Sequence, residues 1–466
     1  MQIPILNGVY VNQINRFGTT YPENLIAEPK QTGINKGYLR PADGIEELAI
    51  GPGVDRGAIN WGDACYRVMG SKLVRVNASG AITELADVEN DGMPVSLAYG
   101  FDRLAIASNG KLFYWDGSVL TQVTDPDLGT AMDVVWIDGY FVTTDGEFIV
   151  VTDLADPTQV NNLKYGASEA NPDPIVALLK IRNELCALNR YTIEFFDNVG
   201  GQYFPFGRID GAQISKGCVG RKSCCMGEGA VFFVGSGINE ASGVYVGGSG
   251  SAQKISTQEI DQILAGYDSL QQAAIELEYR KEDSHSFLYI HLPDQTLLFD
   301  IGATKELDGT PVWSKLKSAN SGQGQYYARH FIYCYGKWLV GHAVDSKIGY
   351  LTSGHAKHWG QYVKWCFSTT VIYNDSSSAI IHSLELIILT HSDATVNSSV
   401  STSYSIDGKT WSQERSLIVR AGVPAKRLRW FRQGYMRHWR IQRFCGLSNA
   451  PISVVRLEAV VEGVGN

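Results

Sequence analysis

The chain has 466 residues, which is too long for one ordinary core, so two or three domains are expected. Its 49 glycines against 15 prolines, with 44% hydrophobic and 11% aromatic residues, favour a turn-rich all-β protein with packed cores. A formal net charge of −8 argues against a general nucleic-acid coat, although a local basic patch is compatible with it.

Neither a secreted nor a membrane protein is indicated. The N-terminus lacks the basic region and apolar core of a signal peptide, and the best apolar run, Ile380 to Leu389, is short and contains His382 and Glu385. The eight cysteines show neither a disulfide framework nor zinc-like spacing. We therefore expect free, buried thiols in a chain that folds in a reducing cytosol.

Residues 1–60 show no regular strand or helix pattern. Turn signals stand at Gly44, Gly51 to Gly53 and Gly57, and apolar residues such as Ile3 and Leu25 argue against full disorder. We expect an extended N-terminal arm over 1–60 that is disordered or lies across another subunit.

From Trp61 onward the chain repeats an apolar strand, a tight polar turn and an aromatic-rich strand. The turns recur about every 36 to 55 residues, a period typical of β-propellers, in which stacked blades cover each other's faces. We predict a propeller of about six to seven blades over 61–354, with two middle blades in 176–250. The aligned segments are 65–85, 104–123, 140–153, 184–197, 230–248, 286–300 and 337–351.

One insertion interrupts the repeats. Ser256 and Glu259, three residues apart, match a capping box, and Gly266 stands where a helix C-cap would fall. We predict one short helix here, which could extend through 269–279 before a strand. After residue 354 longer alternating runs replace the repeats, and they predict an antiparallel β-sandwich of roughly seven or eight strands over 355–466.

No enzyme signature is complete. The stretch SYSIDGKTW (403–411) is close to the Asp-box of sialidase-like propellers, but it lacks one residue after Asp407, occurs once and lies outside the propeller, so a hairpin turn is favoured. Many other aspartates precede glycine in turns. The histidines between 285 and 358 lack a matching carboxylate or cysteine set for a metal. We expect no catalytic residue, no cofactor and no metal.

The most uneven segment runs from Arg420 to Arg443, because no acidic residue occurs between Glu414 and Glu458. Strand alternation around 427–443 would place several arginines on one face of the sandwich. Arginines mixed with aromatics suit a nucleic-acid surface, but also a protein interface. An acidic partner subunit is favoured and DNA contact stays open. The candidate subunit-interface or DNA-facing residues are Arg420, Lys426, Arg427, Arg429, Arg432, Arg437, Arg440, Arg443, Trp430 and Tyr435.

Several stretches, spread in the same order over nearly the whole chain, together resemble the packaged-DNA stabilisation proteins, or tail hub proteins, of short-tailed bacteriophages. The stretches are PENLIAEPK to GYLRPADGI (22–45), YRVMGSKLVRV (66–76), DGEFIVVTDLADP (145–157), NRYTIEFFDNVGG (189–201), ISKGCVG (214–220) and SYSIDGKTW to RLRWFRQG (403–434). The family has no catalytic residues to carry over.

The resemblance implies a structural protein of the virion tail, assembled in the host cytoplasm. Such hubs form a six-fold ring below the portal and its adaptor (the head-to-tail connector), close the DNA exit after packaging, receive the tail needle and help to seat tail fibres or tailspikes. Two other functions stay open from the residues alone. One is a propeller glycosidase acting on the host surface, which needs two acids in the propeller mouth. The other is a glycan- or protein-binding adhesin.

Overall fold

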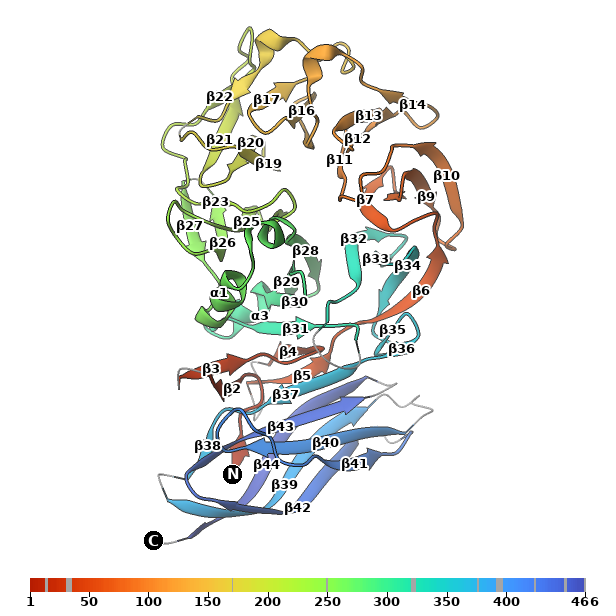
Figure 1. Cartoon of the computed structure of the whole chain (residues 1–466). Coiled ribbons are helices and arrows are strands. Elements are labelled where there is room, and N and C mark those ends of the chain that lie inside the picture. Colours follow the sequence, from red (N-terminus) through yellow and green to blue (C-terminus); the bar gives the residue numbers. More distant parts are fainter. Residues whose placement is uncertain are drawn as a thin grey trace.

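The computed structural model describes residues 1–12, 16–30, 36–169, 171–248, 250–319, 324–374, 377–390, 397–422, 425–447 and 451–464. In this part of the chain a ring of small antiparallel sheets joins a two-sheet sandwich, and both termini lie at the sandwich (Figure 1). The prediction of an all-β propeller followed by a β-sandwich is confirmed.

The first four blades are four-stranded antiparallel sheets in which each strand pairs with the next along the chain. Short hairpins join most of these strands, a long loop from Val151 to Gly166 being an exception, and the repeat is therefore visible in the sequence. The strands are β7 (Asp55–Trp61), β8 (Ala64–Met69), β9 (Lys72–Val76) and β10 (Ile82–Asp87); β11 (Ser96–Tyr99), β12 (Leu104–Ser108), β13 (Lys111–Trp115) and β14 (Leu120–Gln122); β15 (Asp133–Ile137), β16 (Tyr140–Thr144), β17 (Phe148–Val151) and β18 (Gly166–Ala167); β19 (Ile175–Ile181), β20 (Glu184–Asn189), β21 (Ile193–Asn198) and β22 (Phe206–Arg208).

Three further blades complete the ring, so the described residues form seven blades. The fifth has two short inner strands, and the seventh takes its outer strand, β6, from the N-terminal segment. The strands are β23 (Gly217–Cys218), β24 (Cys224–Gly227), β25 (Ala230–Ser236), β26 (Gly243–Gly248) and β27 (Ser251–Lys254); β28 (Glu276–Glu282), β29 (His285–His291), β30 (Thr296–Asp300) and β31 (Trp313–Leu316); β32 (Ala328–Cys334), β33 (Lys337–His342), β34 (Lys347–Thr352) and β6 (Gly44–Ile50).

Apolar clusters lie between successive blades and hold the ring together. Between blades 1 and 2, for example, Val68 and Leu73 pack with Ile106 and Phe113. A corresponding cluster, which includes Val74 and Leu339, joins blade 7 to blade 1. Each blade therefore buries both of its faces against its neighbours, and closure of the ring covers the faces that the first and last blades would otherwise expose.

A buried polar link reinforces the closure between blades 7 and 1. Asp55 accepts hydrogen bonds at 2.7 Å from Arg67 Nη1 and at 2.7 Å from His330 Nδ1. Arg67 Nη2 also donates to the His330 carbonyl at 3.1 Å. The Arg67 and Asp55 side chains are fully buried, so each charge depends on the other for compensation.

The N-terminal segment differs from the irregular arm that the sequence suggests. Its described residues form β1 (Gln2–Ile3), β2 (Gly8–Val11), β3 (Phe17–Thr20), β4 (Leu25–Pro29), β5 (Gly37–Pro41) and β6, all of which pair within this chain. β1 and β5 pair with the C-terminal strand of the sandwich, while β6 closes blade 7. β2 pairs with β3 and β4 pairs with β5 locally, whereas the partners of β1 and β6 lie hundreds of residues away in the chain.

The sandwich has two sheets around a shared apolar core that includes Leu384, Leu386, Val400 and Phe444. Sheet I has the order β4-β5-β44-β39-β42, with β1 beside β44, and sheet II has the order β37-β43-β40-β41, with β38 beside β43. Its remaining strands are β37 (Lys364–Ser368), β38 (Ile372–Tyr373), β39 (Ser378–Thr390), β40 (Ser398–Ser405), β41 (Arg415–Val419), β42 (Ala425–Met436), β43 (Trp439–Leu447) and β44 (Ile452–Val464).

The two domains meet through backbone pairing. Glu23, just before β4, bridges to Lys315 of blade 6 on one side and to Cys366 of β37 on the other. The short strands β35 (Lys357–His358) and β36 (Gln361–Tyr362) pair with each other, and β35 also pairs with β6. The junction is therefore continuous with sheets of both domains.

Three α-helices lie in the described part of the propeller: α1 (Gln258–Ala265), α2 (Ser269–Ala273) and α3 (Ile301–Glu306). Gly266 is the C-cap of α1, as predicted, but the predicted capping box is wrong. Thr257 is the N-cap, Ser256 donates to Asp261 at 2.6 Å, and Glu259 accepts from the Thr19 amide at 2.9 Å. Glu259 thus serves a contact with β3 that the local pattern does not reveal.

Candidate assembly surface

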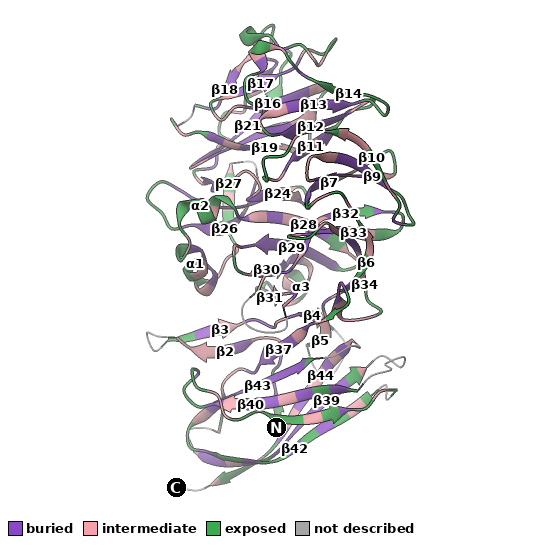
Figure 2. Cartoon of the chain, turned by 45° about the vertical axis from the view of Figure 1, so that its right-hand side comes forward, coloured by how far each residue is buried: buried purple, intermediate pink, exposed green. Residues whose placement is uncertain are grey.

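The arginine-rich segment is divided between the two sheets of the sandwich. β42 is an edge strand of sheet I, whereas β43 lies inside sheet II. On β42 the exposed Arg427 and Arg429 alternate with the buried Leu428 and Trp430. Figure 2, which is coloured by burial, shows both exposed and buried residues along β42. The expectation of one shared arginine face therefore applies to β42 alone, because the chain changes sheets at residues 437–438.

Glu385 on β39 neutralises part of the positive charge on β42. It is the register partner of Arg429, whose Nε donates to Glu385 Oε2 at 2.9 Å. Arg427 Nε donates to the other carboxylate oxygen. The hydrogen bonds from Arg429 and Arg427 hold the pKa of the Glu385 carboxyl below its usual value. The residues selected from the sequence did not include Glu385. It lies 44 residues from Arg429 in the chain, and only strand pairing brings the two together.

Two of the candidates are interior residues. Arg440 is fully buried, with Nη1 donating to the Gln433 carbonyl at 2.8 Å and Nη2 to Gln442 Oε1 at 2.8 Å. Burial lowers the pKa of Arg440 to about 10. Trp430 is buried and its indole donates to the Arg415 carbonyl at 2.9 Å. The expectation that these two side chains face a partner or DNA is wrong, because packing within the sandwich uses them.

The remaining candidates are at the surface. Arg420, Arg432 and Arg437 are exposed, and no ion pair to any of them is found within the described residues. Arg432 has a φ of 54°, at a bulge in the pairing of β42 with β39. Tyr435 is 57% exposed, and Lys426 donates to the Ile418 carbonyl at 3.0 Å. These groups are available for contact with another molecule.

Arg443 lies on the opposite side of sheet II from the core, facing the propeller. It is half-buried, and its guanidinium lies 4.1 Å from the centre of the Trp411 ring. Burial lowers the pKa of Arg443. It is therefore separate from the exposed arginines of β42.

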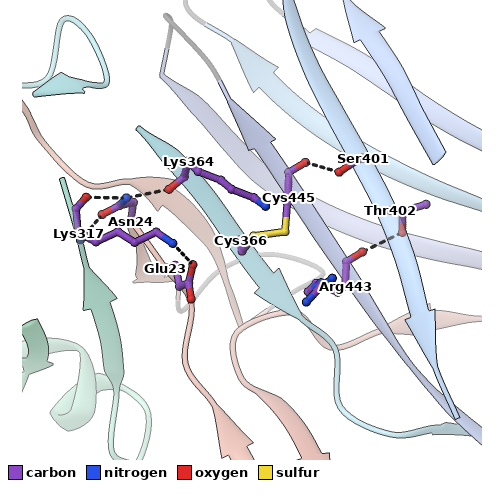
Figure 3. The surroundings of a disulfide bond; sticks show 9 residues. All are labelled: Glu23, Asn24, Lys317, Lys364, Cys366, Ser401, Thr402, Arg443 and Cys445. Atoms are coloured by element: carbon purple, nitrogen blue, oxygen red, sulfur yellow. Dashed lines mark hydrogen bonds and ion pairs between the residues drawn. A yellow bond between two sulfur atoms is a disulfide. The ribbon is translucent and has the colours of Figure 1, made fainter. Parts of the chain in front are cut away.

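A disulfide stands beside Arg443, which overturns the expectation that all the thiols are free. Cys366 on β37 and Cys445 on β43 are direct register partners and form a disulfide (Figure 3). They are 79 residues apart in the chain, so the spacing of the cysteines in the sequence does not indicate this disulfide. The other six cysteines are free, and five of them are buried.

The propeller centre holds ionisable groups that neutralise one another. The inner strands enclose a cavity of about 350 Å³, and a cavity of about 890 Å³ opens beside it around Asp55, Arg56, Glu276 and Arg329. Arg329 pairs with Glu276 at 3.6 Å, while His291 pairs with Glu278 at 3.1 Å. The ion pair of Arg329 with Glu276 joins blade 7 to blade 6. His291 and Glu278 both lie in blade 6, and burial lowers the pKa of His291 to about 4, so this contact is a hydrogen bond within one blade.

The Asp-box-like stretch is a turn. Asp407 accepts hydrogen bonds from the amides of Lys409 and Thr410, both at 2.8 Å, and Gly408 has a φ of 73°. Elsewhere in the described part of the chain, no group of three or more His, Cys, Asp or Glu side chains could hold a metal ion. No helix among the described residues is long and apolar enough to cross a membrane.

The fold is thus that of a closed seven-bladed propeller carrying a sandwich, with an arginine-bearing edge strand. The bacteriophage P22 Gp10 β-propeller family model matches residues 1–356, and the P22 Gp10 β-sandwich family model matches residues 364–462. The chain belongs to this P22 Gp10 family. It is 30% identical over 340 residues to the tail hub protein gp10 of Salmonella phage P22, covering 68% of this chain and 69% of that protein.

The following two solved structures are weakly similar to this chain. A computationally designed protein, Ika8, matches with a TM-score of 0.37 and 14% identity, covering 66% of this chain and 99% of its own. The N-terminal domain of Nup159 matches with a TM-score of 0.41 and 10% identity, covering 71% and 98%. Similarity at this level carries no argument about function.

Proposed function

We propose that the chain is a structural tail hub protein of a bacteriophage virion and is not an enzyme. The observation that carries this proposal is the match of both domains, in order, to the P22 Gp10 family, together with the relative named tail hub protein. The structure supports a mechanical role, since the carboxylates of Glu276, Glu278 and Asp55 near the propeller centre are each held by an Arg or His side chain of the propeller.

As a tail hub, the protein forms a six-fold ring below the portal and its adaptor, the head-to-tail connector. The ring closes the DNA exit channel after packaging and provides attachment for the tail needle and for tail fibres or tailspikes. Such a plug must withstand pressure from packaged DNA, which requires large and permanent interfaces between rigid subunits. The closed propeller and the disulfide-linked sandwich supply that rigidity.

The exposed part of the arginine segment is the proposed contact surface. Arg420, Arg432 and Arg437 have no intramolecular ion pair in the described structure, and Tyr435 is exposed beside them in sequence. An acidic surface of a neighbouring subunit or of the adaptor would compensate these charges. Contact with packaged DNA is the alternative, and the experiment in the next paragraph distinguishes it from contact with a protein subunit.

The test is assembly with double charge reversal. In phage carrying Arg432→Glu and Arg437→Glu, we expect tails that lack this protein, because like charges would oppose the acidic neighbour. The control is Lys281→Glu, a single charge reversal at an exposed lysine of blade 6, and each arginine is also reversed singly for comparison with it. Normal tails that leak packaged DNA would instead assign these arginines to DNA. Normal tails with full DNA retention would show that these arginines are not part of the contact surface. In a separate assay, turnover of host polysaccharide by the purified chain would contradict the non-enzymatic role.

A further inference from the structure

A groove of about 700 Å³ lies between the two domains. Its floor is the outward face of β37 and β43, which carries Lys364, Arg443 and the Cys366–Cys445 disulfide. One wall comes from the β2–β3 hairpin, and the other comes from α1 and from β31 with the residue after it, Lys317. Figure 3 shows Lys364 and Arg443 on the two strands that the disulfide joins, with Lys317 and Glu23 on the propeller side.

The groove gathers four basic side chains: Lys315, Lys317, Lys364 and Arg443. Lys317 pairs with Glu23 at 3.0 Å. For the other three, no hydrogen bond or ion pair from the charged end is found within the described residues. Arg443 Nε is buried without a hydrogen-bond partner, although the guanidinium lies over the Trp411 ring. Burial, reinforced by Lys317, lowers the pKa of the Lys315 ammonium, against the opposing effect of Glu23 and Asp294.

The acidic side chains of the groove already have partners. Glu23 pairs with Lys317, and Glu259 accepts from the Thr19 amide at 2.9 Å. Asp294 accepts a hydrogen bond from the Tyr267 hydroxyl. The groove therefore has three cations whose charges are poorly compensated, in a partly desolvated setting where an added anion would be bound more strongly than on open surface.

We propose that this interdomain groove binds an acidic peptide segment of a partner protein, whose carboxylates pair with Lys315, Lys364 and Arg443. A narrow chain bearing Asp or Glu can lie between the walls and reach the half-buried floor. A DNA duplex is too thick to enter a recess of this size, and phosphate contacts are made by basic side chains that project from a surface. The inference concerns this chain alone and does not rest on the tail hub role.

The test uses the full chain and a fluorescent peptide of alternating Glu and Ser, with a Gln–Ser peptide of equal length for comparison. We expect anisotropy to report binding of the Glu peptide only, and Lys364→Glu to weaken it at least tenfold. Lys281→Glu makes the same charge change at an exposed side chain of β28 in blade 6, outside the groove, and it should leave affinity within twofold. Equal losses in the two variants, or equal binding of the Gln peptide, would overturn the proposal.

A second measurement needs no substitution and so covers the case in which Lys364→Glu does not fold. Brief amine acetylation, read by mass spectrometry, should show Lys315 and Lys364 protected by the Glu peptide and Lys281 unprotected. Lack of protection at Lys315 and Lys364 would overturn the proposal. So would the same protection by a short DNA duplex or single strand, or by inorganic phosphate alone, since each would assign the groove to a different ligand.

Discussion

Arg440 shows how one residue type has different roles within a single segment. Its guanidinium is the buried hydrogen-bond donor to Gln433 and Gln442. Replacement by Met would leave both acceptors unpaired, so we expect Arg440→Met to lower the free energy of unfolding by about 3 kcal/mol. Urea denaturation of the purified chain measures this loss.

The matched variant is Arg437→Met, in the exposed turn between β42 and β43. It should change stability by no more than about 0.5 kcal/mol. If Arg440→Met is as harmless as Arg437→Met, Arg440 is not the internal brace described here.

The disulfide between Cys366 and Cys445 is a second contact between individual residues that stabilises the sandwich. Because it closes a loop of 79 residues, it should stabilise the sandwich by about 4 kcal/mol through the unfolded state. Dithiothreitol should lower the melting temperature of the unmodified chain but not that of Cys445→Ser. Thiol titration of the denatured, unreduced protein should find six thiols of the eight cysteines. Eight thiols and no effect of dithiothreitol would refute the bond.

His358 links stability to pH at the domain junction. Burial, followed by the charge of His355, lowers its pKa to about 3 from the usual 6.5. A His whose folded pKa is depressed is protonated first in the unfolded chain, so its contribution to stability is present above pH 6.5 and is lost as pH falls towards 3. We expect His358→Gln to lose less stability than the unmodified chain between pH 7 and pH 5, measured by urea denaturation. An equal or larger loss would show that His358 does not carry this dependence.

At the scale of elements, β6 is the strand that closes the propeller. Ile45 is fully buried between blades 6 and 7, whereas Ile50, at the end of the same strand, is 65% exposed. Ile45→Ala should lower the free energy of unfolding by about 3 kcal/mol, because it leaves a cavity between blades 6 and 7. Ile50→Ala should cost less than about 0.5 kcal/mol. Similar effects of the two substitutions would mean that the strand does not seal the ring.

The blades were predictable because their hairpins are local: each strand pairs with its neighbour in the chain, so turns and alternation appear in the sequence. β6 was missed because its partner, β34, lies some 300 residues onward. β5 pairs locally with β4, and only its contact with β44 spans some 400 residues. The fold class and the sandwich could thus be predicted from the hydrophobic and turn pattern of the sequence. The strand that completes blade 7 could not.

The candidate surface was predicted only as a charge pattern. The sequence marks Arg427 and Arg429 as basic, but only the register of β39 brings Glu385 to them. It likewise does not show that Arg440 points inward after the chain changes sheets at Arg437. The groove cations Lys315 and Lys364 come from different domains, so no window of sequence unites them.

At the scale of the molecule, the propeller and the sandwich are joined by the bridges of Glu23 to Lys315 and Cys366. A subunit braced in this way can transmit load from one domain to the other. That property suits the proposed ring under DNA pressure, with the exposed arginines of the sandwich on the contact surface.

The most direct test of the proposed function is the copy number and position of this protein in the virion, by electron microscopy of purified particles. We predict six copies in a ring around the DNA channel, below the portal and adaptor. A single copy, or copies located only on fibres away from the channel, would contradict the tail hub role.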